Sequence, residues 1–158
     1  MEKASLPYRT ELALLNEFAH LLLQADSESE VAWTIAKQAI AHLDFEDCIV
    51  YLNNPEQNEL IQIAAFGPKN PISFDILNPI TIKVGSGIVG TAASLQVTQK
   101  VDDVALDDRY IVDDKARSSE LAIPMVFKGE CLGVVDSEHS STHFFTDRHC
   151  QILSTVTD

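Results

Sequence analysis

GSGIVG, residues 85–90, is the stretch of sequence that decides the fold. It matches G-x-G-x-x-G, which binds pyrophosphate in dinucleotide-binding folds when it lies between a strand and a helix. Here ITIKV (80–84) precedes it, and IVGTAASL (88–95) can form a helix after it. Two interpretations follow: a nucleotide site, or a tight turn that connects a strand to a short helix.

The strand pattern before the glycines argues against a nucleotide site. A dinucleotide-binding fold needs parallel strands that are buried on both faces and read as continuous apolar runs. ITIKV alternates instead, with Thr81 and Lys83 between apolar residues, which is typical of a strand with one solvated face. Hairpin patterns on both sides predict antiparallel neighbours. We therefore interpret the glycines as a tight turn, in which Gly90 lets the helix lie close to the sheet.

The rest of the chain predicts helices at both ends of a run of short strands. Apolar residues spaced by three and four predict a first helix near 12–23, and Ser27 begins a capping box for a second helix. Lys128-Gly129 is a two-residue hairpin signal, and Thr146 precedes a final helix. The expected strands are 48–52, 59–66, 80–84, 97–101, 120–127 and 130–138.

The composition excludes several classes of function. The chain has 158 residues, enough for one domain, and a net charge of −13 from 24 acids and 11 bases, which repels nucleic acid. No apolar run reaches the length of a membrane span and no signal peptide is evident, so we expect a cytoplasmic domain without membrane contact. Three scattered cysteines, without a C-x-x-C motif, are interpreted as structural thiols.

Five motifs in a fixed order make the chain resemble a GAF domain, a small ligand-sensing module. They are VGSGIVGTAA (84–93), DDRYIVDD (107–114), SSELAIPM (118–125), GECLGVVDSEHS (129–140) and FFTDRHCQIL (144–153). The resemblance implies an α+β, GAF/PAS-like fold. A central antiparallel sheet of about six strands would carry the terminal helices on one face, and a short helix and loops would form a pocket on the other. One domain is expected over 1–158, with N-terminal helices in 1–44, the sheet and pocket in 46–140, and the start of a longer signalling helix in 146–158.

DSEHS followed by FFT is similar to N-terminal sensory GAF domains of bacterial two-component sensor proteins. The resemblance implies a regulatory module that senses a small molecule, forms a homodimer through its terminal helices and precedes a histidine kinase. One alternative is a degenerate GAF domain with a filled pocket, used only for dimerisation. Another is an enzyme similar to the free methionine-(R)-sulfoxide reductases.

The reductase branch of the GAF family resembles this chain in its acids but not in its cysteines. These enzymes place reactive cysteines near the glycine helix and in the loop before S-x-E, positions that here hold Ile88, Val89, Asp113 and Asp114. The acids that hold the substrate have counterparts in Glu120, Asp136 and Glu138. We therefore expect that this domain is not an enzyme and has no catalytic residue or cofactor. His139 and His143 are interpreted as exposed loop residues rather than metal ligands.

An unidentified small-molecule ligand is expected in the pocket. Leu132, Val134, Asp136 and Glu138 share one face of a strand, and acids on such a face need water, a base or a polar ligand. An acidic floor would suit an amine-bearing ligand, whereas Arg117 could instead neutralise an acid internally, and the sequence leaves both open. The polar excursion 102–118 is the expected lid. The candidate ligand-binding residues are Tyr51, Phe66, Ile88, Val89, Tyr110, Arg117, Glu120, Asp136 and Glu138.

Overall fold

A computed structural model describes residues 26–67, 79–110 and 117–157, and it confirms the predicted α+β fold. Six antiparallel strands form one sheet in the order β3-β2-β1-β6-β5-β4. The predicted first helix lies outside the described residues. The elements are α2 (Glu28–Leu43), β1 (Cys48–Asn54), β2 (Glu59–Phe66), β3 (Thr81–Lys83), α3 (Gly87–Leu95), β4 (Gln99–Val101), the 3-10 helix η1 (Val104–Leu106), β5 (Ser119–Phe127), β6 (Glu130–His139) and α4 (Asp147–Thr157).

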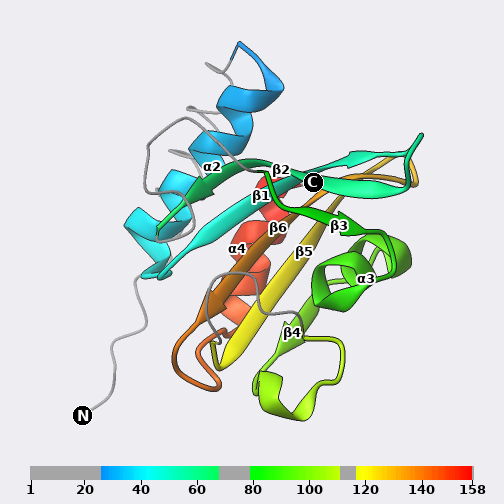
Figure 1. Cartoon of the computed structure of the whole chain (residues 1–158). Helices are drawn as coiled ribbons and strands as arrows, with labels where there is room; N and C mark the ends of the chain where they lie inside the picture. Colours follow the sequence, from blue (N-terminus) through cyan, green and yellow to red (C-terminus); the bar gives the residue numbers. More distant parts are fainter. Residues whose placement is uncertain (1–25, 68–78, 111–116, 158) are drawn as a thin grey trace.

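The sheet separates two apolar cores. In Figure 1, α4 lies behind the sheet and α3 in front of it. The helix-side core joins α2 and α4 to one face of the sheet and includes Ile35, Val50, Val135 and Leu153. The cavity-side core joins α3 to the other face through residues that include Ile49, Tyr51, Leu60, Ile88 and Val134. No helix in the described ranges is both long and apolar enough to cross a membrane.

A β-bulge changes which side chains of β2 reach each core. Val50 pairs with Ala64, whereas the next residue, Tyr51, pairs with Gln62, so Ile63 is the extra residue of β2. A bulge of this kind reverses the alternation of side chains beyond it. Phe66 consequently packs against the helix-side core, although simple alternation from Leu60 predicts the other face.

The glycine turn seats α3 on the sheet, as the sequence predicts. Gly85 and Gly87 have φ angles of +89° and +69°, which favour glycine. A Cβ atom at Gly90 would lie 2.5 Å from the carbonyl oxygen of Lys83, so α3 can approach β3 only because this position has no side chain. At the other end of α3, the Gln96 side chain donates to the carbonyl of Gly129 in the β5–β6 turn, at 2.9 Å.

Helix caps and an aromatic cluster fix α2 and α4. Ser27 accepts a hydrogen bond from the Glu30 N–H at 3.2 Å, which confirms the predicted cap. Thr146 accepts from the His149 N–H at 3.3 Å, and the Thr146 N–H donates back to Nδ1 of His149 at 3.1 Å. The His149 ring stacks on Phe144, with ring centroids 5.3 Å apart. The start of α4 therefore depends on an unprotonated Nδ1 in an aromatic environment.

Substituting Gly90 with Ala tests the close approach of α3. Helix propensity alone predicts that Gly90→Ala stabilises the fold by about 1 kcal/mol. The 2.5 Å approach to Lys83 predicts the opposite sign, a loss of about 1–3 kcal/mol from overpacking. Urea unfolding measures the difference. Ser94→Ala, an exposed position on the same helix, is the control and should be neutral or slightly stabilising. A stabilised Gly90→Ala protein would contradict the interpretation.

Acidification tests the His149 contact. Burial, followed by the nearby charge of Arg148, lowers the pKa of His149 below its ordinary value. Its contribution to stability is therefore present above the unfolded-state pKa of about 6.5 and is lost as the pH falls through the lower folded-state value. We expect His149→Gln to flatten the decline in unfolding free energy between about pH 7.5 and 5.5. His143→Asn, at an exposed histidine, should leave that decline unchanged.

Candidate functional site: a small cavity with an acidic wall

A cavity of about 310 Å³ lies on the face of the sheet that carries α3. This is near the lower end of the size range of small-molecule sites, roughly 300–1,000 Å³. Residues of β1, β3, α3, β5 and β6 line it. Six of the nine predicted ligand-binding residues are in its wall: Tyr51, Ile88, Val89, Glu120, Asp136 and Glu138.

Three carboxylates form the acidic wall of the cavity. Glu120 on β5 is paired directly with Glu138 on β6, and Ala122 is paired with Asp136. Side chains directly opposite each other in an antiparallel pair have Cβ atoms about 4.5–5.5 Å apart, and like charges there repel. Glu120, Asp136 and Glu138 are only 5%, 2% and 1% exposed. The chain therefore concentrates acidic side chains where little water reaches them.

Asp47, a fourth buried acid, holds this wall in place and was not predicted. It directly precedes β1 and is fully buried. Its Oδ1 accepts the backbone N–H of Glu138 at 2.8 Å, and its carbonyl accepts the Ser137 hydroxyl at 2.6 Å. The only sequence signal is an acid next to an apolar strand, which is too common a pattern to identify such a contact.

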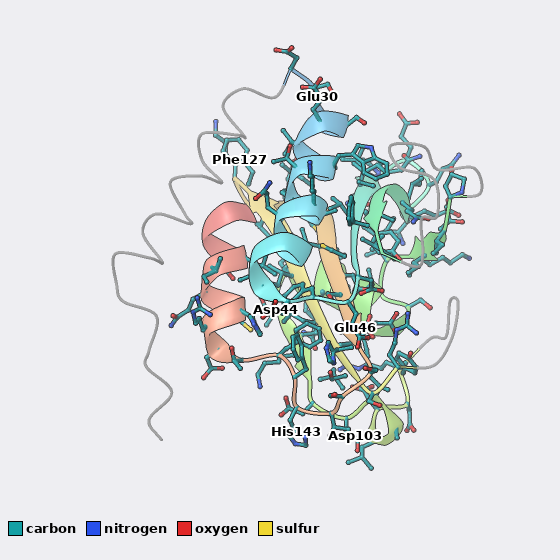
Figure 2. The ribbon with its side chains drawn as sticks, turned by 90° about the vertical axis from the view of Figure 1, so that its left-hand side faces the viewer. Glu30, Asp44, Glu46, Asp103, Phe127 and His143 are labelled. Atoms are coloured by element: carbon teal, nitrogen blue, oxygen red, sulfur yellow. The ribbon has the colours of Figure 1, made fainter. Side chains whose placement is uncertain are left out.

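Arg117 is a buried cation, but it does not line the cavity. Its Nε lies 4.0 Å from a carboxylate oxygen of Glu46, a partner that the sequence did not suggest. Burial raises the pKa of Glu46, but hydrogen bonds from Ser140 outweigh burial and the pKa lies below its ordinary value. Figure 2 places Glu46 just beyond Asp44, at the end of α2, on the half of the molecule that carries Asp103 and His143.

His139 differs from the predicted exposed loop residue. It ends β6, and its side chain is 13% exposed. The ring stacks on Phe144 at 3.6 Å between centroids, and Nε2 lies 3.4 Å from Glu46. His143 is exposed, as predicted. Among the described residues, no three His, Cys, Asp or Glu side chains are grouped closely enough to hold a metal ion.

The remaining two predicted residues, Phe66 and Tyr110, also lie outside the cavity wall. The β2 bulge places Phe66 against the helix-side core. Tyr110 packs against the cavity-side core, and its hydroxyl accepts the backbone N–H of Arg117 at 2.9 Å. Tyr110 therefore contacts the cavity-side core but does not form part of the cavity wall.

The wall opposite the acids is the start of α3, which has the opposite polarity. Ser86, Gly87, Ile88 and Val89 all line the cavity. The first N–H groups of a helix have no intrahelical acceptor and carry a partial positive charge. The Ser86 side chain does not cap them, and the first turn contains no acid. The cavity thus has a negative side and a side rich in N–H donors.

The described cysteines lie away from the cavity wall. Cys48 is buried in the helix-side core. The Cys131 thiol donates to the Gly133 carbonyl at 3.2 Å, and burial raises its pKa. Burial likewise raises the pKa of Cys150 on α4. None of the described residues that line the cavity is a cysteine. Asp113 and Asp114 lie outside the described residues.

A second cavity of about 1,040 Å³ is larger, but no buried acid of the described ranges lines it. Its wall is mainly apolar, with Val31 and Ile35 of α2 and Leu132 of β6, and its acids, Asp26 and Glu130, are exposed. It also reaches Asp26, where the described chain begins. Convergent buried polar groups distinguish a binding site from a general hollow. We therefore place the candidate site in the smaller, acidic cavity.

Two curated relatives are free methionine-R-sulfoxide reductases. The protein from Escherichia coli (strain K12) is 37% identical over 74 residues, which cover 47% of this chain and 45% of that protein. The protein from Saccharomyces cerevisiae is 41% identical over 56 residues, which cover 35% of this chain and 31% of that protein. The matches thus span less than half the length of either relative.

A solved structure with a similar fold is that of free methionine-R-sulfoxide reductase from Neisseria meningitidis in complex with its substrate. It superimposes with a TM-score of 0.84 at 20% sequence identity, covering 98% of this chain and 87% of that one. These findings contradict the expectation that this domain is not an enzyme, because the named relatives are enzymes. That expectation was wrong because it relied on four positions, 88, 89, 113 and 114, and gave too little weight to the rest of the chain.

The family is shown by a match that covers most of the sequence. The family model described as "GAF domain" matches residues 27–158, which include every described strand and helix. The antiparallel sheet, the glycine turn into α3 and the cavity between them agree with the fold that the motifs implied. This chain therefore belongs to the GAF domain family.

Proposed function

We propose that this chain is a GAF domain of the free methionine-R-sulfoxide reductase type, and that its acidic cavity binds the free sulfoxide amino acid. The observation that carries the proposal is the charge arrangement of the cavity. Three buried carboxylates face the uncapped start of α3 across about 310 Å³. The names of the two curated relatives supply the substrate class.

The buried charges favour a cationic group in the ligand. In the ranges that the structure describes, the buried acids are Asp47, Glu120, Asp136 and Glu138, and the buried guanidinium is that of Arg117. Buried ionised carboxylates are stable only when hydrogen bonds and opposite charges replace the lost water. A ligand ammonium placed among Glu120, Asp136 and Glu138 would supply such a charge. The acids therefore favour an amine-bearing ligand over a neutral or anionic one.

The start of α3 favours a carboxylate at the other end of the same ligand. A helix N-terminus carries the equivalent of roughly half a positive charge and presents free N–H groups. A free α-amino acid has both required charges, whereas the same residue within a peptide chain has neither. Ile88 and Val89 add an apolar wall next to this end, suited to a methylene chain.

A sensing role is the second candidate, and the lack of a cysteine in the described cavity wall favours it. Reduction of a sulfoxide to a thioether removes oxygen as water and needs two electrons, which thiols commonly supply. A cavity that holds the amino acid without a thiol can instead report its presence to neighbouring elements. α4 packs on β5, which carries Glu120. A change at Glu120 on ligand binding could therefore alter the position of α4 and reach an effector that follows it. Dimerisation through the terminal helices, a histidine kinase partner and a cytoplasmic location remain predictions.

Calorimetric titration with free L-methionine-R-sulfoxide tests the proposed ligand. We expect binding by the wild-type protein and a loss of about tenfold or more in Asp136→Asn, because a hydrogen bond to a charged group contributes about 1.5–3 kcal/mol. Glu130→Gln, at an exposed acid on the same strand, is the matched control and should bind normally. The N-acetylated amino acid, which lacks the ammonium, should not bind.

Turnover is measured separately, as the release of free methionine in the presence of dithiothreitol. Binding with turnover supports the reductase activity, and binding without turnover supports the sensing role. If the wild-type protein binds the acetylated and the free amino acid equally well, or binds neither, the proposed recognition of the ammonium is wrong.

Replacing Arg117 tests the internal charge balance. Its side chain is 2% exposed, so Arg117→Met removes a buried cation, and we expect a loss of about 3–5 kcal/mol in unfolding free energy at pH 7. Arg109→Met is the control, because the Arg109 side chain is 37% exposed and its pair with Asp107 should contribute no more than about 1 kcal/mol. Equal losses in urea unfolding would show that the acids do not depend on Arg117.

A further inference from the structure

The Tyr110 hydroxyl connects the turn that follows η1 to the acidic wall without entering the cavity. Its oxygen accepts the backbone N–H of Arg117 at 2.9 Å. A second hydrogen bond joins the hydroxyl to the Glu138 carboxylate. Tyr110 is not among the residues that line the cavity, whereas Glu138 is. The phenol is thus placed to act on a ligand through Glu138 rather than directly.

A rigid turn fixes Tyr110 relative to the sheet. Asp107 accepts hydrogen bonds from the Arg109 backbone N–H and Nε at 2.9 Å each, and from Nη2 at 2.7 Å. The remaining Arg109 nitrogen, Nη1, donates to Gln99 on β4 at 3.0 Å. The Tyr110 N–H donates to the Asp107 carbonyl at 3.2 Å. The position of the phenol is therefore set by β4 and this turn, independently of any ligand.

The direction of the hydrogen bonds determines what Tyr110 does to Glu138. Because Arg117 donates to the phenol oxygen, the phenol proton remains to be donated to the Glu138 carboxylate. Burial, chiefly, and the neighbouring Glu138 raise the pKa of Tyr110, so the phenol keeps this proton at neutral pH. Glu138 is then held twice, by Tyr110 through its side chain and by Asp47 through its backbone N–H.

We propose that Tyr110 is a positioning residue that orients the Glu138 carboxylate toward the ammonium of an amino-acid ligand. A carboxylate that accepts one fixed proton presents its remaining lone pairs in a defined direction. Tyr110 thereby tunes selectivity for a protonated amine and contributes nothing to the rest of the ligand. This inference rests on the proposed function, because it needs an amino acid in the cavity.

The test compares two ligands in two variants. Tyr110→Phe keeps the aromatic ring and removes only the hydroxyl. The ligands are free L-methionine-R-sulfoxide and 4-(methylsulfinyl)butanoic acid, which is the same molecule without its amine. We expect Tyr110→Phe to weaken binding of the amino acid about tenfold or more, the loss typical of one hydrogen bond to a charged group, and to leave the weak binding of the amine-free acid unchanged.

Asp108→Asn is the matched control, because Asp108 is an exposed acid of the same turn and the variant keeps the Tyr110 hydroxyl. It should not reproduce the selective loss for the amino acid. Equal weakening of both ligands in Tyr110→Phe, or no weakening of either, would overturn the positioning role while leaving the proposed function intact. If the wild-type protein binds neither ligand, the proposed function fails, and the role of Tyr110 fails with it.

Discussion

Two glutamates that face each other across a buried strand pair set the main physical constraint on this domain. Glu120 and Glu138 are direct partners in the β5–β6 register, and neither is more than 5% exposed. Like charges in this position oppose pairing of the very strands that carry them. Neighbouring residues hold Glu138 by hydrogen bonds. Asp47 accepts the Glu138 backbone N–H, and Tyr110 hydrogen-bonds the Glu138 carboxylate.

The division of the sheet into two faces explains how the fold tolerates this constraint. The helix-side core, packed by α2 and α4, is apolar and carries the cohesion of the domain. The other face is only partly covered, by α3, and keeps an open cavity beside the acids. The cavity and its acids thus lie on the opposite face of the sheet from α2 and α4. The packing of α2 and α4 does not involve the cavity acids, so this packing is kept even though the acids repel one another.

The features that local sequence determines were predicted correctly. The glycine turn, the caps at Ser27 and Thr146, and the Lys128-Gly129 hairpin each depend on a few adjacent residues. Alternation along β6 likewise placed Asp136 and Glu138 on the cavity face.

Features that depend on distant parts of the chain were missed. One extra residue in β2 moved Phe66 to the opposite core, and nothing in its local pattern signals the bulge. The contacts of Asp47 and Glu46 join residues about ninety positions apart. The enzymatic relationship was missed for a similar reason, because single positions were weighed instead of the whole chain.

The two outermost strands, β3 and β4, have a further consequence for the behaviour of this domain in a crowded solution. Each is only three residues long, and each ends its side of the sheet. An exposed edge is a template on which another chain can add a strand, and short edges are poor templates. β3 and β4 themselves therefore offer few unpaired backbone groups to another strand. Another chain that approaches either end of the sheet would therefore meet mainly side chains along β3 and β4 rather than a long row of unpaired backbone groups.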